Sequence, residues 1–400
     1  MPELEESEPF CYNEKMKLNF FFKKKKLENF CVLDIGTEAV KTLVFRKENN
    51  KNIILGRTSE YFEGAEIFGN LDFPERILEK TISRTIDQIS KIAKIKPKNI
   101  FLGLPTNILI AKIVSQNFER KDPKEPISES EKNKIHEEVF RYIKNKIAQE
   151  FSQKTRFLPQ DFHFSNLKIL ETKIDGYEVP SILNLSGRKL EFKVLAVFLS
   201  RFQLKKIERI CQNLNLKILK IVHPAENLDY LFPNEKINAI ELDIGGKMTN
   251  IFLIEKGKLI EISQFNQGGI NFTEKIYQHL GLSFSEARIL KENYSHSILS
   301  EKVQKRMKEI FFDILQSWFE NLKENLKKFP QKLLPANFFL FGGGSLLPDI
   351  SEILENGDWA DLTFISKPKI EIIYPQKLKN IEDKKQILNS PQDIPLILLS

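Results

Sequence analysis

Two short stretches of the sequence, Leu33-Asp34-Ile35-Gly36-Thr37 and Leu242-Asp243-Ile244-Gly245-Gly246, follow one pattern. Each closes an apolar run typical of a β-strand, and each leads from a carboxylate through a glycine turn into a second apolar run. A repeated strand, carboxylate, glycine turn and returning strand predicts two related half-domains that face each other across a phosphate.

The residue types in these turns suit phosphate and metal chemistry. Glycine lets backbone N–H groups approach phosphate oxygens with no side chain in the way. We expect Gly36 and Gly245 to supply the turns. An aspartate at a strand end can hold Mg²⁺ or its water ligands, so Asp34 and Asp243 are the candidate metal ligands.

The first turn carries two further candidates. Thr37 adds a hydroxyl group, and Lys41, on the strand that leaves the turn, is placed to reach the β- and γ-phosphates as a point charge. A lone Asp-x-Gly-Thr is more typical of an ordinary hairpin. The functional interpretation therefore depends on a third element.

That third element is an apolar run, Phe338-Phe339-Leu340-Phe341, which continues into Gly342-Gly343-Gly344-Ser345 and a helical pattern. Three glycines permit close backbone approach to a flat or anionic ligand, and the following helix presents its N-terminus. Alone, such a run is better explained by a tight turn between a strand and a helix. Three elements in this order and at these intervals are more specific.

This order resembles the actin-like ATPase superfamily, with a first phosphate loop, a second phosphate loop and an adenosine loop. Within it the chain looks most like the FtsA family of bacterial cell-division proteins, with the PilM family of pilus-assembly ATPases as the close rival. The resemblance extends from about Cys31 to the end of the chain. Further matching pieces are Gln267-Gly268-Gly269 followed by Thr273, and Phe284-Ser285-Glu286-Ala287 followed by Lys291.

The resemblance implies an α/β fold, the duplicated ribonuclease H-like fold of actin, with an inserted small α+β subdomain. It also implies that ATP and Mg²⁺ bind between the two halves. The nucleotide-binding residues that it implies are Asp34, Gly36, Thr37, Lys41, Asp243, Gly245, Gly246, Thr249, Gly268, Gly269, Lys291, Gly342, Gly343, Gly344 and Ser345.

The second phosphate loop departs from the family pattern. Relatives often continue Gly-Gly-Gly-Thr-Thr-Asp, whereas this chain has Gly245-Gly246-Lys247-Met248-Thr249-Asn250. Lys247 either pairs with a phosphate or fills the space of the γ-phosphate. Arg288 also stands where relatives often carry a second glutamate. We therefore expect nucleotide binding without fast hydrolysis, which leaves a weak ATPase and a scaffold without hydrolysis as alternatives.

The order of predicted elements divides the chain into an N-terminal tail (1–30), a first half (31–106 with 203–236), an inserted subdomain (107–202) and a second half (237–400). Inside the insertion, Asp175-Gly176-Tyr177 and the stretch from Leu185 to Phe192 resemble the FtsA version. Thr249-Asn250 and the basic residues before the first phosphate loop resemble PilM-like chains instead. The sequence thus favours FtsA and leaves the rival open.

Composition restricts the alternatives. The formal net charge of +7 arises from 61 basic residues set against 54 acidic ones, which is typical of a mixed solvated surface and not of a nucleic-acid binder. The three cysteines and five histidines form no metal-ligand spacing, so we expect reduced thiols and a cytoplasmic protein. A kinase of the same superfamily is disfavoured, because no general-base aspartate follows a glycine-rich loop.

The N-terminal tail has an unusual pairing of residues. Phe20-Phe21-Phe22 precede four lysines, Lys23 to Lys26, and such a segment can dock weakly on an anionic membrane surface. The alternative is a tail whose phenylalanines pack on the first half. No apolar stretch reaches the length of about 18 to 20 residues that a membrane span needs.

Taken together, the FtsA resemblance implies a protein peripheral to the inner face of the cell membrane. It would self-associate, contact other division proteins and tether the ring of FtsZ, a tubulin homologue. The alternative is a PilM-like cytoplasmic component of a type IV pilus or secretion platform.

Overall fold

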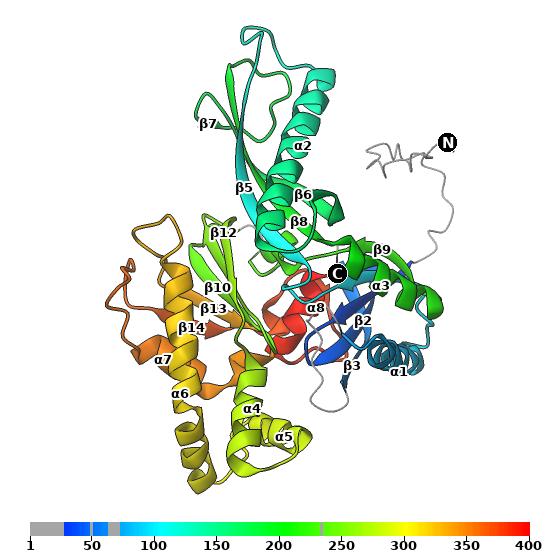
Figure 1. Cartoon of the computed structure of the whole chain (residues 1–400), viewed down its shortest axis with the longest axis vertical. Helices are drawn as coiled ribbons and strands as arrows, with labels where there is room; N and C mark the ends of the chain where they lie inside the picture. The colour runs from blue at the N-terminus through cyan, green and yellow to red at the C-terminus, as the bar shows by residue number, and fades with distance from the viewer. Residues whose placement is uncertain (1–27, 49–50, 63–72, 233–234) are drawn as a thin grey trace.

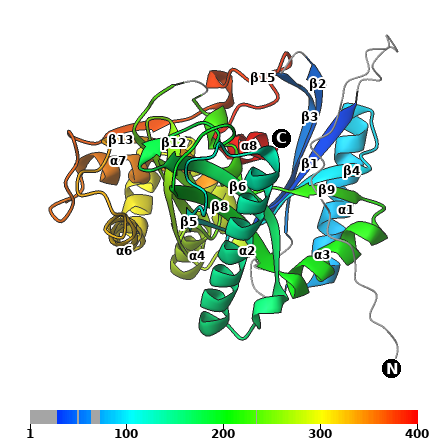
Figure 2. The same cartoon turned by 90° about the horizontal axis from the view of Figure 1, so that it is seen from above.

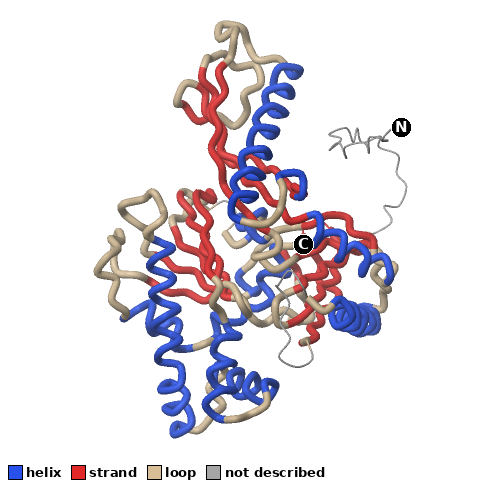
Figure 3. The backbone as a smooth tube through the Cα atoms, viewed as in Figure 1, coloured by secondary structure: helices blue, strands red, loops and turns tan. Residues whose placement is uncertain are grey.

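The computed structural model describes residues 28–48, 51–62, 73–232 and 235–400. The tail that was expected to contact a membrane lies outside these residues, except for its last three positions. Figure 3 shows the strands gathered into three groups with helices around them. These groups are a six-stranded, a five-stranded and a four-stranded sheet.

The first sheet has the strand order β15-β3-β2-β1-β4-β9. Strands β1, β2 and β3 are antiparallel neighbours, whereas β1, β4 and β9 run parallel. Helices α1 and α3 pack against each other beside this sheet. The bounds are β1 Asn29–Ile35, β2 Ala39–Glu48, β3 Lys51–Tyr61, α1 Glu75–Ala93, β4 Asn99–Gly103, α3 Arg201–Asn213 and β9 Lys217–Ile221.

The second sheet, in the order β12-β11-β10-β13-β14, repeats the first. Again three strands are antiparallel and the following two are parallel to the central one. This repetition confirms the predicted duplicated actin-like fold. The bounds are β10 Ala239–Ile244, β11 Thr249–Glu255, β12 Lys258–Phe265, α4 Gly269–Leu280, α5 Phe284–Ser295, α6 Glu301–Leu326, β13 Asn337–Phe341, α7 Pro348–Asn356 and β14 Lys369–Ile372.

The third sheet, β5-β8-β6-β7, is antiparallel and stands above the other two with helix α2 along it (Figure 1). Strand β8 belongs to two cores, because Leu195, Val197 and Leu199 face the core of the first sheet while Val194 and Ala196 pack in the core around α2. The insertion is therefore joined to the first half by a shared strand. The bounds are β5 Ile110–Glu119, α2 Glu129–Lys154, β6 Phe162–Ile174, β7 Tyr177–Glu178 and β8 Lys189–Ser200.

The C-terminal segment returns to the first half. Strand β15 (Ile381–Glu382) pairs with β3, and helix α8 (Ile394–Leu398) is buried in the first core between the two larger sheets (Figures 1 and 2). The buried Asp393 pairs with Arg57 at 2.9 Å. The sequence placed this segment with the second half. We propose instead to assign residues 373–400 to the first half, because their apolar side chains fill its core.

Between β9 and β10 the chain forms two single turns of 3-10 helix, Pro224–Glu226 and Leu228–Tyr230. The carboxylate of Glu226 turns back to accept the backbone N–H of His223 at 2.9 Å, which closes the first turn after one repeat. As for membrane crossing, the helices in the described ranges all lack the combination of length and apolar character that it requires.

Candidate nucleotide site

The first hairpin holds Asp34 and Lys41 side by side. The two residues are direct partners in the β1–β2 ladder, and the Gly36 N–H closes the turn by donating to the Ala39 carbonyl at 2.9 Å. A Cβ atom at Gly36 would lie only 3.0 Å from that carbonyl oxygen. The tight glycine turn thus places a carboxylate and an ammonium group at the same sheet edge.

The second hairpin repeats this geometry with different partners. The Gly245 N–H donates to the Met248 carbonyl at 2.9 Å, and Asp243 faces Asn250 in the β10–β11 ladder. The Asn250 amide donates to Asp243 Oδ2 at 3.2 Å, and both side chains are buried. The carboxylate of the second hairpin is therefore held by an amide, with no cation opposite it in the ladder.

The glycine loop after β13 packs tightly against the second hairpin. Gly342 has a φ of +82°, and a Cβ there would lie 2.6 Å from Asp243 Oδ1. A Cβ at Gly344 would lie 2.4 Å from a methyl carbon of Ile244. At Gly343 a Cβ would meet no atom nearer than Gln392 Cβ at 4.0 Å. Gly342 and Gly344 are thus required for packing, whereas Gly343 faces open space.

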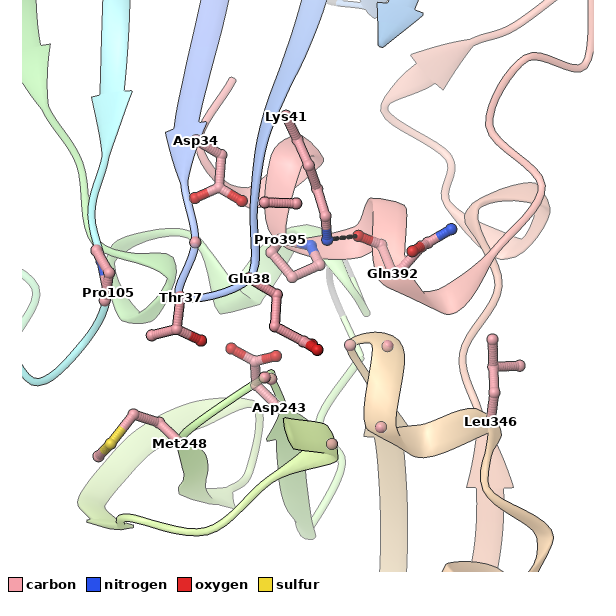
Figure 4. A pocket seen from close by; sticks show the side chains of 18 of the residues that line it. Asp34, Thr37, Glu38, Lys41, Pro105, Asp243, Met248, Leu346, Gln392 and Pro395 are labelled. Carbon is pink, nitrogen blue, oxygen red and sulfur yellow. Dashed lines mark hydrogen bonds between the residues drawn. The ribbon is translucent and has the colours of Figure 1, made fainter. Parts of the chain in front are cut away.

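These three loops surround one cavity of about 270 Å³. Figure 4 shows the carboxylates of Asp34, Glu38 and Asp243 facing this space, with the Lys41 side chain beside them. Of the residues predicted from sequence, those that line the cavity are Asp34, Gly36, Thr37, Lys41, Asp243, Gly245, Gly246, Gly269, Lys291, Gly342, Gly343 and Gly344.

Three predicted residues lie behind the cavity wall. The Thr249 hydroxyl donates to the Gln267 carbonyl at 2.7 Å and accepts the Trp318 ring N–H at 2.9 Å. The Ser345 hydroxyl donates to the Gly342 carbonyl at 2.7 Å. A Cβ at Gly268 would lie 2.5 Å from the Gly245 carbonyl oxygen. In this arrangement all three hold the loops in place.

The two aspartates are electrostatically unusual. Burial raises the pKa of Asp34, and the nearby Lys41 ammonium partly opposes this. Burial, with a smaller contribution from the Asp34 charge, raises the pKa of Asp243 to about 7, although the Asn250 hydrogen bond and Lys41 oppose this rise. Two buried carboxyl groups that repel each other are stabilised as carboxylates when a cation lies nearby.

These carboxyl groups fit Mg²⁺ bound through one or two carboxylates with phosphate and water as the other ligands. Within the part of the chain that the structure describes, no cluster of three or more His, Cys, Asp or Glu residues could hold a metal ion by itself. The donor set therefore suits a metal that arrives with a nucleotide.

The halves also meet directly at the two phosphate loops. The backbone N–H of Lys247 donates to Thr37 Oγ1 at 3.0 Å. The cavity wall at this turn is formed by Gly245, Gly246 and Met248, and the Lys247 side chain is not part of it in the described structure. Both expectations for Lys247, phosphate pairing and occupation of the γ-phosphate space, are therefore unsupported.

Helix α5 makes a second set of contacts across the cleft, which we name the α5 bridge. The Arg288 guanidinium lies 3.9 Å from the centre of the Tyr61 ring, and the Tyr61 hydroxyl donates to Glu292 at 2.8 Å. Lys291 donates to the Gly269 carbonyl at 3.0 Å and lies 3.7 Å from Glu38. Arg288, which departs from the family pattern, thus contributes to closing the cleft.

Sequence reasoning missed several lining residues. Tyr61, Pro105 and Thr106 end or follow strands of the first sheet, and Gln392 belongs to the C-terminal segment. The Gln392 carbonyl accepts the Lys41 ammonium at 3.1 Å (Figure 4). Pro105 and Thr106 follow the carboxyl end of β4, which runs parallel to β1. Ligands of open α/β sheets bind at this edge, so the position of the two residues is the signal that could have identified them from the sequence.

Comparison with known proteins shows what this chain is similar to. A family model described as cell division protein FtsA matches residues 240–392. The cell division protein FtsA of Staphylococcus epidermidis is 22% identical over 355 residues, which cover 81% of this chain and 71% of that protein. FtsA of Enterococcus hirae is 25% identical over 347 residues, covering 81% and 75%.

Among solved structures, a PilM-PilN type IV pilus biogenesis complex contains a similar chain. The TM-score is 0.67 at 17% identity, with 92% of this chain and 97% of that chain covered. This likeness concerns the fold. In sequence, then, this chain is similar to the FtsA cell-division proteins, and in fold it is similar to the chain of the pilus biogenesis complex.

Proposed function

We propose that this protein binds ATP with Mg²⁺ between its halves and acts in bacterial cell division. In this role it would self-associate at the inner face of the cell membrane and tether the ring of an FtsZ-like tubulin homologue. The single observation that carries the nucleotide part is the convergence of both aspartate hairpins and the Gly342–Gly344 loop on one cavity. The division role is supported by the match to the FtsA family.

In the proposed complex, each half contributes its own hairpin to the phosphates. Lys41 would exchange its contact with the Gln392 carbonyl for a phosphate oxygen, and the glycine turns would offer backbone N–H groups. Mg²⁺, when bound, supplies the positive charge that offsets the phosphates and the buried carboxylates of Asp34 and Asp243. The open space beside Gly343 would take the adenosine, next to Lys291.

The nucleotide would then act as a clamp. The Thr37–Lys247 contact and the α5 bridge already join the halves, and a ligand that touches both hairpins favours the closed arrangement by its differential affinity. We propose slow or absent hydrolysis, because Asn250 stands where relatives often carry a carboxylate. Its amide is engaged with Asp243.

Titration calorimetry of the full chain with Mg-ATP tests nucleotide binding. Gly343→Val places its branched side chain into open cavity space and should abolish binding, whereas Gly343→Ala, whose Cβ meets only Gln392 Cβ at 4.0 Å, should bind more weakly than wild type but measurably. Thermal unfolding of both variants checks that the fold is intact. Absence of binding heat in the wild type at millimolar Mg-ATP would refute the proposal.

The division role needs a separate test. Full-length protein should co-sediment with polymers of an FtsZ-like protein, and it should pellet with anionic liposomes at low salt through the basic and aromatic N-terminal segment. A version that begins after Lys26 should lose the liposome contact and keep the polymer contact. Failure to bind the polymers, together with capture of a short peptide from a membrane partner, would favour the PilM-like role instead.

A further inference from the structure

A second cavity lies where the three sheets meet, away from the nucleotide site. Its walls come from β6 of the insertion, from the two 3-10 turns after β9, and from β10, β11 and β12 of the second sheet. Figure 1 shows the insertion standing directly over this junction. An occupant of this cavity would touch all three parts of the molecule at once.

One wall residue of the cavity has an unmatched polar group. Glu241, in the middle of β10, is only 1% exposed, and no hydrogen-bond partner in the described structure reaches its Oε2. A buried carboxylate without a partner costs several kcal/mol, by order of magnitude, unless a cation or hydrogen-bond donor compensates it. The carboxyl group of Glu241 is therefore the polar anchor of this cavity.

The other charged groups around the cavity are engaged elsewhere or lie at its rim. Lys168 donates to the Glu226 carbonyl at 2.6 Å, and Lys258 is paired with Glu178. The Glu226 carboxylate pairs with Lys220 at 2.9 Å. Both lysines of the lining thus have partners of their own, and neither is bonded to Glu241.

The rest of the lining is apolar or open to solvent. Ile169, Leu228, Ile254 and Leu259 belong to the lining, and Lys168, Asp229 and Lys258 are exposed at its edge. Exposed rim residues give a ligand a way in, and aliphatic walls suit a hydrocarbon stem. The lining carries two lysines against three acidic residues, Glu226, Asp229 and Glu241, so its formal charge favours a cation.

From this arrangement we infer that the cavity binds an organic cation, a guanidinium or primary ammonium group on a short apolar stem, paired with the Glu241 carboxylate. The chemistry is that of an arginine or lysine side chain from a partner polypeptide, or of a small free amine. Because the walls come from three parts of the chain, the bound cation would hold the insertion in one position relative to both halves.

The test compares n-butylguanidinium with its neutral isostere n-butylurea on the full chain, by calorimetry at constant ionic strength. Wild type should bind the cation about tenfold or more tightly than the urea, a difference that a single buried ion pair supports. Glu241→Gln should abolish this preference. Glu261→Gln, a matched change of a half-buried carboxyl group on β12 outside the cavity, should preserve it.

A second measurement keeps the inference testable if Glu241→Gln does not fold. The methyl NMR signals of Ile254 and Leu259, which line the cavity, should shift on addition of n-butylguanidinium, whereas that of Ile276 in the second core should not. Equal affinity of the two ligands, a preference that survives Glu241→Gln, or unshifted cavity methyl signals would each overturn the inference.

A comparison of two peptides distinguishes the two possible sources of the cation. Acetyl-Leu-Arg-Leu-amide is compared with acetyl-Leu-Gln-Leu-amide on the same protein. Selective binding of the arginine peptide in addition to n-butylguanidinium supports a side chain from a polypeptide, and selective binding of n-butylguanidinium alone supports a small free amine. Absence of selectivity in both pairs contradicts the proposed site.

Discussion

The two aspartate hairpins share one backbone geometry but differ in the charge of the residue that faces the aspartate. Asp34 and Asp243 occupy equivalent ladder positions before glycine turns that close with the same 2.9 Å hydrogen bond. Across the ladder, Asp34 faces a lysine and Asp243 faces an asparagine. The Asp34 carboxylate therefore has a countercharge within its own hairpin. The Asp243 carboxylate is stabilised by a hydrogen bond and by any cation that enters the cavity.

The comparison predicts a strong pH dependence of the protein free of nucleotide and metal. The pKa of Asp243 is raised from 3.8 to about 7 in the folded state, so between these values the unfolded chain has lost a proton that the folded chain still holds. The free energy of unfolding must then fall as pH rises from about 4 to about 7, by up to about 4 kcal/mol from this group.

Asp243→Asn tests this contribution by urea unfolding in EDTA across that pH range. In the variant, the free energy of unfolding should fall less steeply with pH, by the slope that one titrating proton contributes. Glu241, whose pKa burial also raises, contributes in the same direction and remains in both proteins. If the free energy of unfolding depends on pH in the same way in variant and wild type, the Asp243 carboxylate is as well compensated as that of Asp34.

The next largest effect is expected at Lys41. Lys41→Met keeps the length of the side chain but removes the charge that faces Asp34 and that would meet the phosphates. We expect Mg-ATP affinity to fall about tenfold to a hundredfold, since a hydrogen bond to a charged group contributes about 1.5 to 3 kcal/mol. Calorimetry measures the loss. Lys247→Met serves as the matched control from the second hairpin and should bind normally.

A smaller effect is expected at Asn250. Asn250→Leu removes the hydrogen bond to Asp243 and keeps the branched shape of the side chain, and it should lower the free energy of unfolding at pH 7 by about 1 to 2 kcal/mol. In the Asp243→Asn background the same change should cost measurably less, because no carboxylate is left without its partner. A double-mutant cycle gives the coupling, and additive costs would show that the two side chains act independently.

The smallest effect is expected at Lys247. Because its side chain is not part of the cavity wall, Lys247→Ala should leave nucleotide affinity and turnover unchanged within about twofold and stability within about 0.5 kcal/mol. The backbone N–H that reaches Thr37 is retained in this variant. Raised ATPase turnover would instead show that the lysine occupies phosphate space in solution.

Much of the fold was readable in the sequence, because the relevant signals are local. Apolar runs, glycine turns and their order identified the duplicated halves. The strands that carry Asp34 and Asp243, and the strand that leads into Gly342–Gly344, formed where their patterns predicted. That Thr249, Gly268 and Ser345 lie behind the cavity wall was not readable in this way. That a residue is close in sequence to a glycine motif does not say on which side of the loop it lies relative to the ligand.

What the sequence by itself determined is therefore the pair of hairpins, the glycine loop and the resemblance that they carry, since each rests on neighbouring residues and backbone preferences. Tertiary structure alone decided that residues 373–400 pack into the first core, that Lys41 meets Gln392 across 351 positions of chain, and that Arg288 and Glu292 close the cleft over Tyr61. The physical reason is that such contacts depend on which buried surfaces fit together, and no local periodicity or spacing encodes the fit between residues so far apart in the chain.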